Sequence, residues 1–197
     1  MKYSLAQIRS TLKKKGYIFF DKDKKIYNLN IIGVRTSNNV ANSFDDWLYL
    51  IYRNESGEFQ VHEFPITTDP GAYWLENPMN VNGTAILIPG QYRGSHKIGL
   101  HQGKYEALKQ KSDLKVWRDS NRDNKIDTGG QVYKGIFGIN IHRSNATSES
   151  TQVNKWSAGC QVFKKVDDFN FFMETCRKAR DLYTNSFTYT LLEESDF

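Results

Sequence analysis

Residues 46–67, DWLYLIYRNESGEFQVHEFPIT, decide the fold class of this chain. The runs Trp47–Tyr52 and Glu58–Phe64 are rich in aromatic and branched side chains, which favour strands. Between them, Ser56-Gly57 supplies turn chemistry, and a short connection containing glycine is typical of a β-hairpin. The stretch therefore predicts two antiparallel strands and a mainly β fold.

Short strands are expected on both sides of this hairpin. Turn residues separate them, for example Asn38-Asn39 and Asp69-Pro70-Gly71. The expected strands are Ile26–Arg35, Asp46–Arg53, Gln60–Thr67, Thr84–Tyr92, Ser112–Arg118, Val132–Arg143 and Phe187–Leu192. The intervening segment Gly103–Gln110 is predicted to form one short helix.

Two amphipathic helices are expected, one near each end of the sequence. Ser4 followed by Gln7 is the pattern of a capping box, and Gly16 supplies a stop, which together predict a helix over residues 4–15. A second apolar stripe at helical spacing consists of Val166, Phe169, Phe172, Met173, Cys176 and Ala179. Because Cys176 lies on this apolar face, we expect its thiol to be buried and inert.

The size of the chain fits one domain. A chain of 197 residues and 22.8 kDa is of ordinary domain size, and 39% hydrophobic residues indicate a globular protein. No repeat, low-complexity segment or linker divides the sequence. We therefore expect a single α+β domain over residues 1–197 that is mainly β with a few helices.

Several classes of protein are excluded by composition. The net charge of +5 comes from dispersed lysines and arginines, which argues against nucleic-acid binding. No apolar run approaches the roughly 20 residues that span a bilayer, so no membrane contact is expected. The N-terminus lacks the apolar stretch of a secretory signal, which predicts synthesis in the cytoplasm. Two cysteines, Cys160 and Cys176, do not make a disulfide scaffold.

The residues with the clearest chemistry are a histidine and a cysteine. The strand-like run Gly138–Ser144 contains His142, and fourteen residues separate His142 from Ser157 in the turn Ser157-Ala158-Gly159-Cys160. A thiol attacks as the thiolate, and a neighbouring imidazole can take its proton and return it to a leaving group. The residues alone leave two alternatives open for Cys160: it is a catalytic nucleophile, or it is a buried structural cysteine, which is the more common case.

This spacing resembles the catalytic domain of the L,D-transpeptidases, the YkuD-like family. That family has a histidine, a gap of similar length, and then a Ser/Thr-His-Gly-Cys motif. The resemblance implies that Cys160 is the nucleophile, that His142 is the base, and that the backbone carbonyl of Arg143 orients the imidazole. It also implies that the backbone near Gly159 binds the oxyanion and that no cofactor is required.

The resemblance further implies a fold and a substrate. The fold would be a YkuD-like mixed β-sandwich, with the catalytic core at residues 84–165, a helix and strands of unassigned role at 1–83, and a helix and strand at 166–197. The activity would be acyl transfer or hydrolysis on peptidoglycan stem peptides. The implied substrate-binding residues are Ser157, Trp156, Tyr92 and His101.

Three departures from the family pattern keep a second function open. Arg143 stands where the family has glycine, Ala158 replaces the second motif histidine, and Val162 replaces an arginine or asparagine. The losses at Ala158 and Val162 favour a non-catalytic structural or cell-wall-binding protein of a phage virion or a secretion apparatus, whereas the retained spacing of His142 and Cys160 opposes it. With either function, a chain without a signal would meet the wall after lysis, in a virion or through dedicated secretion.

A separate motif predicts a metal site. Residues 119–127 read D-x-N-x-D-N-x-I-D, with oxygen ligands at the alternate positions that the first half of a calcium loop requires. The expected ligands of a structural calcium ion are Asp119, Asn121, Asp123 and Asp127. Gly130 occupies the place of the final bidentate acid, so an ordinary polar turn is the alternative.

Overall fold

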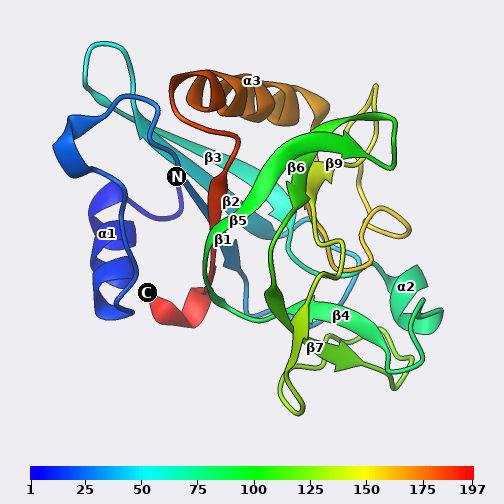
Figure 1. Cartoon of the computed structure of the whole chain (residues 1–197). Helices are drawn as coiled ribbons and strands as arrows, with labels where there is room; N and C mark the ends of the chain where they lie inside the picture. The colour runs from blue at the N-terminus through cyan, green and yellow to red at the C-terminus, as the bar shows by residue number, and fades with distance from the viewer.

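The computed structural model describes all residues 1–197 and is mainly β with three helices, which confirms the expected α+β class. Eight strands form a closed barrel in the order β1-β11-β5-β6-β9-β10-β3-β2 (Figure 1). Its strands are β1 (Asn30–Arg35), β2 (Asp46–Arg53), β3 (Phe59–Thr67), β5 (Gly90–His101), β6 (Tyr105–Gln110), β9 (Ile141–Arg143), β10 (Gln161–Phe163) and β11 (Phe187–Glu193). The pairs β1–β11 and β9–β10 are parallel, and the other pairs are antiparallel.

The predicted hairpin is present as β2 and β3, paired from Asp46↔Ile66 to Arg53↔Phe59. Alternate residues of β2 enter two different cores because successive side chains of a strand point to opposite faces. Leu48 and Leu50 lie in the main core, whereas Tyr49 and Ile51 lie in a second core. Both faces are therefore covered, which explains why this strand has an almost continuous apolar sequence.

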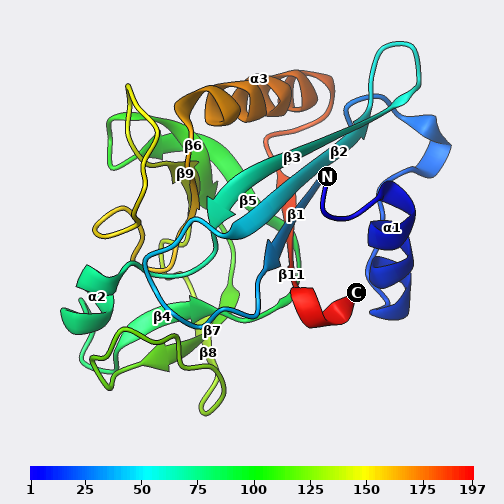
Figure 2. The same ribbon diagram turned by 180° about the vertical axis from the view of Figure 1, so that it is seen from behind.

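The N-terminal helix α1 (Leu5–Lys14) covers the second core. Its capping box is present, since the Ser4 hydroxyl accepts from the Gln7 N–H while the Gln7 side chain accepts from the Ser4 N–H. Ile8 and Leu12 are buried against β1 and β2. The two chain termini lie close together on this side of the barrel (Figures 1 and 2), where Tyr3 stacks on Phe197 at 3.8 Å.

The long helix α3 (Val166–Leu182) lies across the top of the barrel in Figure 1. Its predicted apolar stripe faces inward, and Phe172, Met173 and Cys176 are buried in the main core. Cys176 is therefore enclosed, as expected. None of the three helices combines the length and the apolar character that a membrane-spanning segment requires.

A small second sheet lies at the lower end of the barrel (Figure 2), and two of the predicted strands are each divided between this sheet and the barrel. It contains β4 (Thr84–Leu87), β7 (Leu114–Asp119) and β8 (Tyr133–Gly135), in the order β4-β7-β8. The expected strand Thr84–Tyr92 is two strands, because the chain leaves the small sheet at Ile88-Pro89 and enters the barrel as β5. The expected strand Val132–Arg143 likewise divides into β8 and β9 around Gly138, whose φ is +76°.

The predicted helix Gly103–Gln110 is wrong. The segment forms β6, which pairs along its whole length with β5 after a tight turn at Gln102 and Gly103, both with positive φ. Its residues have good helix propensity, but pairing with a long neighbouring strand outweighs local propensity. Residues 72–76 form a short helix, α2 (Ala72–Glu76), and two 3-10 turns are present, η1 (Lys22–Lys24) and η2 (Glu194–Asp196).

Candidate active site

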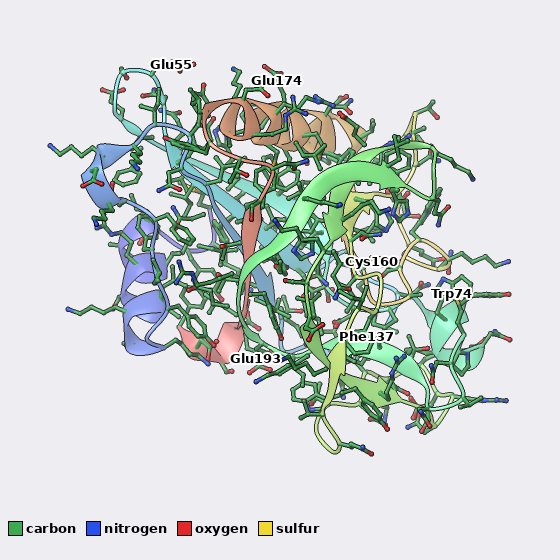
Figure 3. All side chains as sticks on the ribbon, in the orientation of Figure 1. Glu55, Trp74, Phe137, Cys160, Glu174 and Glu193 are labelled. Atoms are coloured by element: carbon green, nitrogen blue, oxygen red, sulfur yellow. The ribbon has the colours of Figure 1, made fainter.

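The parallel pairing of β9 with β10 brings the segments of the predicted nucleophile and the predicted base side by side. Gln161 pairs with Ile141 and Val162 pairs with His142, so Cys160 lies beside Asn140, two residues before His142. The hydrogen bond from Gln161 N to Asn140 O, 2.9 Å, extends the pairing to this point. Figure 3 labels Cys160 in this region, between the barrel strands and the small sheet.

The turn that carries Cys160 is held by Ser157 and Gly159. The Ser157 hydroxyl donates to Cys160 O at 2.8 Å and accepts from Gly159 N–H at 3.2 Å. Gly159 has a φ of +113°, and a Cβ at this position would lie 2.4 Å from the carbonyl oxygen of Ala85. Only glycine satisfies both conditions, so the turn sequence is required by geometry.

His142 is held in one tautomer by its neighbour in the chain. Its Nδ1 lies 2.7 Å from the carbonyl oxygen of Arg143, and a carbonyl can only accept, so Nδ1 carries the proton. The Tyr105 hydroxyl donates to the same carbonyl at 3.2 Å. Nε2 is then the unprotonated nitrogen, which is the form of imidazole that can accept a proton.

The environment of His142 keeps the imidazole neutral. The side chain is buried, and the ring of His101 stacks on it with a centroid distance of 4.1 Å. Burial, assisted by the charge of His101, lowers the pKa of His142 to about 3. His142 is therefore an uncharged base at neutral pH.

The thiol of Cys160 is half-buried and also neutral. Its Sγ donates to Gly138 O and accepts from Asn140 N–H, both at 3.4 Å, and it makes no hydrogen bond with His142. Burial raises the pKa of Cys160 to about 11, and the Asn140 N–H acts weakly in the opposite direction. The resting pair is consequently a thiol and a neutral imidazole rather than a thiolate and an imidazolium.

The structure shows which backbone amide of the predicted oxyanion region is free. The N–H of Gly159 already donates to the Ser157 hydroxyl, so it is not free to bind an oxyanion. The backbone N–H of Cys160 makes no hydrogen bond within the protein. This is the free donor that the turn presents beside the sulfur.

Two of the four expected substrate-binding residues line a cavity with His142. His101 and Trp156 contribute to a cavity of about 420 Å³ that also contains Tyr105 and Arg143. Ser157 is fully buried, and its hydroxyl is used by the turn. Tyr92 lies away from this cavity, and its hydroxyl donates to Ile88 O at 2.6 Å. These positions assign Ser157 and Tyr92 to the architecture of the protein rather than to substrate contact.

Several polar residues that sequence reasoning missed hold the site together. Asn140 accepts from Gln110 N–H at 2.9 Å through Oδ1, and its Nδ2 lies 3.1 Å from Nδ1 of His101. The side chain of Gln110 accepts from the N–H groups of Phe137 and Ile139. This network connects the strand before His142 to β6 and to His101. One signal in the sequence could have found Asn140: it lies two residues before His142 in a strand-like run, so both side chains point to the same face.

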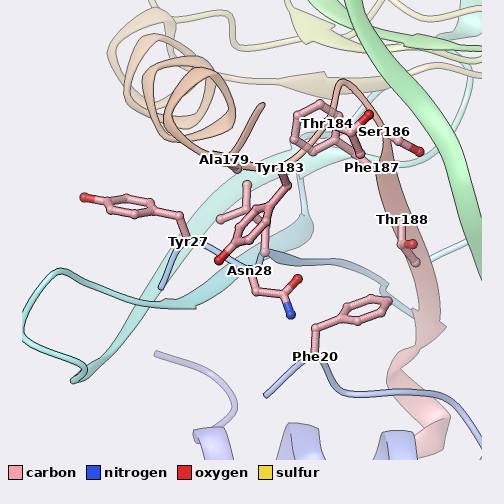
Figure 4. A pocket seen from close by; sticks show the side chains of 10 residues that line it. Phe20, Tyr27, Asn28, Ala179, Tyr183, Thr184, Ser186, Phe187 and Thr188 are labelled. Atoms are coloured by element: carbon pink, nitrogen blue, oxygen red, sulfur yellow. The ribbon is translucent and has the colours of Figure 1, made fainter. Parts of the chain in front are cut away.

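A second pocket lies far from this chemistry. It has a volume of about 190 Å³ between the end of α3 and the strand β11, and Figure 4 shows the side chains around it. Tyr27, Asn28 and Tyr183 line it, and it contains no cysteine, histidine or carboxylate. We assign no catalytic role to it.

The predicted calcium loop is folded as a hydrogen-bonded turn. Asp119 is buried, its Oδ2 accepts from Asp127 N–H at 3.0 Å, and its Oδ1 has no partner. Nδ2 of Asn121 donates to carboxylate oxygens of Asp123 and Asp127 at 3.1 and 2.7 Å. No group of three or more His, Cys, Asp or Glu side chains is arranged to hold a metal ion, so the calcium ion stays a prediction.

Comparison with known protein families, with curated proteins and with solved structures finds no match to this chain.

The neutral state of Cys160 predicts a pH profile for its alkylation by iodoacetamide. Because the reactive form is the thiolate and the pKa is about 11, the rate should be slow at pH 7 and should rise about tenfold per pH unit towards pH 11. Cys176, which is fully buried, should stay unmodified in the folded protein and is the internal control. A fast rate that is constant from pH 6 upwards would show a preformed thiolate and contradict this description.

The calcium prediction is tested by thermal unfolding. If Asp119, Asn121, Asp123 and Asp127 bind calcium in the folded state only, millimolar calcium should raise the melting temperature, because a ligand of the folded state stabilises it by mass action. Magnesium at the same concentration and the variant Asp123→Asn are the controls, and both should show a smaller shift. An unchanged melting temperature would show that residues 119–127 form an ordinary polar turn that does not bind calcium.

Proposed function

We propose that this protein is a cysteine-dependent acyltransferase or hydrolase with Cys160 as nucleophile and His142 as general base. The observation that carries the proposal is the hydrogen bond from His142 Nδ1 to the carbonyl of Arg143, which leaves Nε2 as a proton acceptor on the strand next to Cys160. Together with the Ser-x-Gly-Cys turn, this arrangement has the chemistry that acyl transfer requires.

The neutral pair defines the first chemical step. The sulfur of Cys160 attacks a carbonyl carbon while its proton passes to Nε2 of His142, and the carbonyl electron pair moves to oxygen. We assign the stabilisation of this oxyanion to the N–H of Cys160, which makes no hydrogen bond within the protein. The oxyanion then collapses, the C–N bond breaks, and the proton on Nε2 goes to the departing amine, which leaves a thioester on Cys160.

The second step resolves the thioester. Water or an amine attacks the thioester carbonyl, and its proton passes to Nε2 of His142. The proton then returns to the departing sulfur and restores the thiol. Water gives hydrolysis, as in an L,D-carboxypeptidase or endopeptidase, and an amine gives transpeptidation. No step needs a cofactor.

The substrate class rests on the resemblance to L,D-transpeptidases. We infer that peptidoglycan stem peptides are the substrate and that the barrel is a divergent form of the β core of that family. Two cavities support a substrate that extends on both sides of the turn, one lined by His142 and the other by Ala158. Such a protein would act on the cell wall after lysis, from a virion or through a secretion machine.

The second candidate is a structural or wall-binding protein of a phage virion or secretion apparatus. One observation favours it: Val162, at the place of the family's polar residue, is fully buried in β10 and cannot contact a substrate. Under this proposal the Cys160 site would bind wall fragments without turnover. The two candidates differ in whether a covalent intermediate forms.

The activity is tested by incubating the protein with purified sacculi or stem tetrapeptides and analysing the products by mass spectrometry. Wild type and Cys176→Ala should release or exchange the terminal D-residue, and Cys160→Ala should not. Cys160→Ala should change the free energy of unfolding by less than about 1 kcal/mol, as at sites outside the core. Cys176→Ala removes a buried sulfur and should cost about 1 kcal/mol, so its retained activity separates catalysis from stability.

Three results would argue against the enzyme. An active Cys160→Ala would show that Cys160 is not the nucleophile. An inactive but folded Cys176→Ala would show that the wrong thiol had been chosen. If wild type binds sacculi but shows no turnover on any stem peptide and no acylated Cys160, the structural protein is the better description.

A further inference from the structure

Arg118, on β7, is a cation without an anionic partner. Only Nη1 of its guanidinium donates a hydrogen bond, to the carbonyl oxygen of Gly83 at 3.0 Å. Its Nε is buried and has no acceptor, and Nη2 makes no hydrogen bond within the protein. Burial lowers the pKa of Arg118, and no carboxylate opposes that effect. The buried Nε without an acceptor is unfavourable in the free protein, and an anion that binds the half-buried guanidinium would supply one.

Two aromatic rings hold this guanidinium in place. Its central carbon lies 5.2 Å from the ring centroid of Phe137 and 5.8 Å from that of Tyr133. Tyr133 is on β8, which pairs with β7, so strand pairing places this ring next to Arg118. The side chain is therefore positioned before any ligand binds, which reduces the entropy that binding would cost.

The guanidinium lines a cavity of about 270 Å³ that borders the turn of Cys160. Ala158 of that turn and Ala85, whose carbonyl packs on Gly159, form one wall. Phe137 forms another, and the residue after it, Gly138, accepts a hydrogen bond from Cys160 Sγ. Figure 3 labels Phe137 and Cys160 in this part of the molecule. Arg118 is the one charged side chain among the nine residues that line the cavity.

We propose that this cavity is a substrate subsite in which Arg118 binds a carboxylate of the peptide whose carbonyl is attacked by Cys160. The inference rests on the proposed function for the identity of the peptide, and on the contacts of Arg118 for the charge of the bound group. A single cation among neutral and apolar residues matches a singly charged carboxylate better than a doubly charged phosphate. A carboxylate also supplies acceptors for the N–H groups that Arg118 leaves unused.

The test compares stem tetrapeptides that differ by one amide. Each free carboxylate of the peptide is converted to its amide in turn, and kcat/KM is measured for wild type, Arg118→Gln and Arg93→Gln. Arg93 is an exposed residue of β5 outside both cavities, so its replacement removes the same charge elsewhere. At one of the carboxylates, wild type and Arg93→Gln should have a kcat/KM about tenfold or more higher for the acid than for the amide. This ratio is the effect of losing a hydrogen bond to a charged group. Arg118→Gln should lose this preference, because its neutral side chain does not distinguish the acid from the amide by charge.

A binding measurement separates this inference from the proposed function. Cys160→Ala and the double variant Cys160→Ala/Arg118→Gln are titrated with the same acid and amide peptides by calorimetry. The carboxylate subsite is supported, even if wild type shows no turnover, when Cys160→Ala binds one acid peptide more tightly than its amide and the double variant does not. Equal affinity for every acid and amide pair, or a preference that survives Arg118→Gln in a folded protein, would overturn it.

Discussion

The candidate site depends on the parallel pairing of two three-residue strands, β9 and β10. Cys160 follows a long polar segment after His142, and the register Ile141↔Gln161 sets Cys160 level with Asn140, two residues before His142. A slip by one residue would turn one side chain to the opposite face of the sheet. Closure of the barrel on both sides of this pair, by β6 and by β3, fixes the register. The fold thereby holds Cys160 and His142 on neighbouring segments of one sheet.

The parts of the fold that were predictable are those in which local pattern and tertiary environment agree. The hairpin of β2 and β3, the capping box of α1 and the apolar stripe of α3 all follow this rule. Two errors lie where the chain passes between sheets. Ile88-Pro89 and Gly138 interrupt runs that have continuous strand character, and the interruption depends on which sheet each half joins. β6 was predicted as a helix because its pairing partner, β5, is defined only in the folded chain.

The sequence indicates the reactive groups of the candidate site, but it does not indicate the residues that hold these groups in position. The family resemblance indicates His142, Cys160 and the carbonyl of Arg143, and in the structure this carbonyl accepts a hydrogen bond from His142. Asn140 and Gln110 act through hydrogen bonds between strands distant in sequence, which no local pattern encodes. Ser157 and Tyr92 are predicted to touch substrate, but the hydroxyl of each donates to a backbone carbonyl, and Ser157 is also fully buried.

The central claim is that His142 is a neutral base with its proton on Nδ1, and NMR of the ¹⁵N-labelled imidazole tests it most directly. The hydrogen bond to Arg143 O and the lowering of the pKa to about 3 predict a protonated Nδ1, a bare Nε2 and no titration between pH 5 and pH 9. His62, whose pKa burial also lowers, and the buried His96 provide reference signals in the same spectrum. A proton on Nε2, or an imidazolium at neutral pH, would contradict this account of the site.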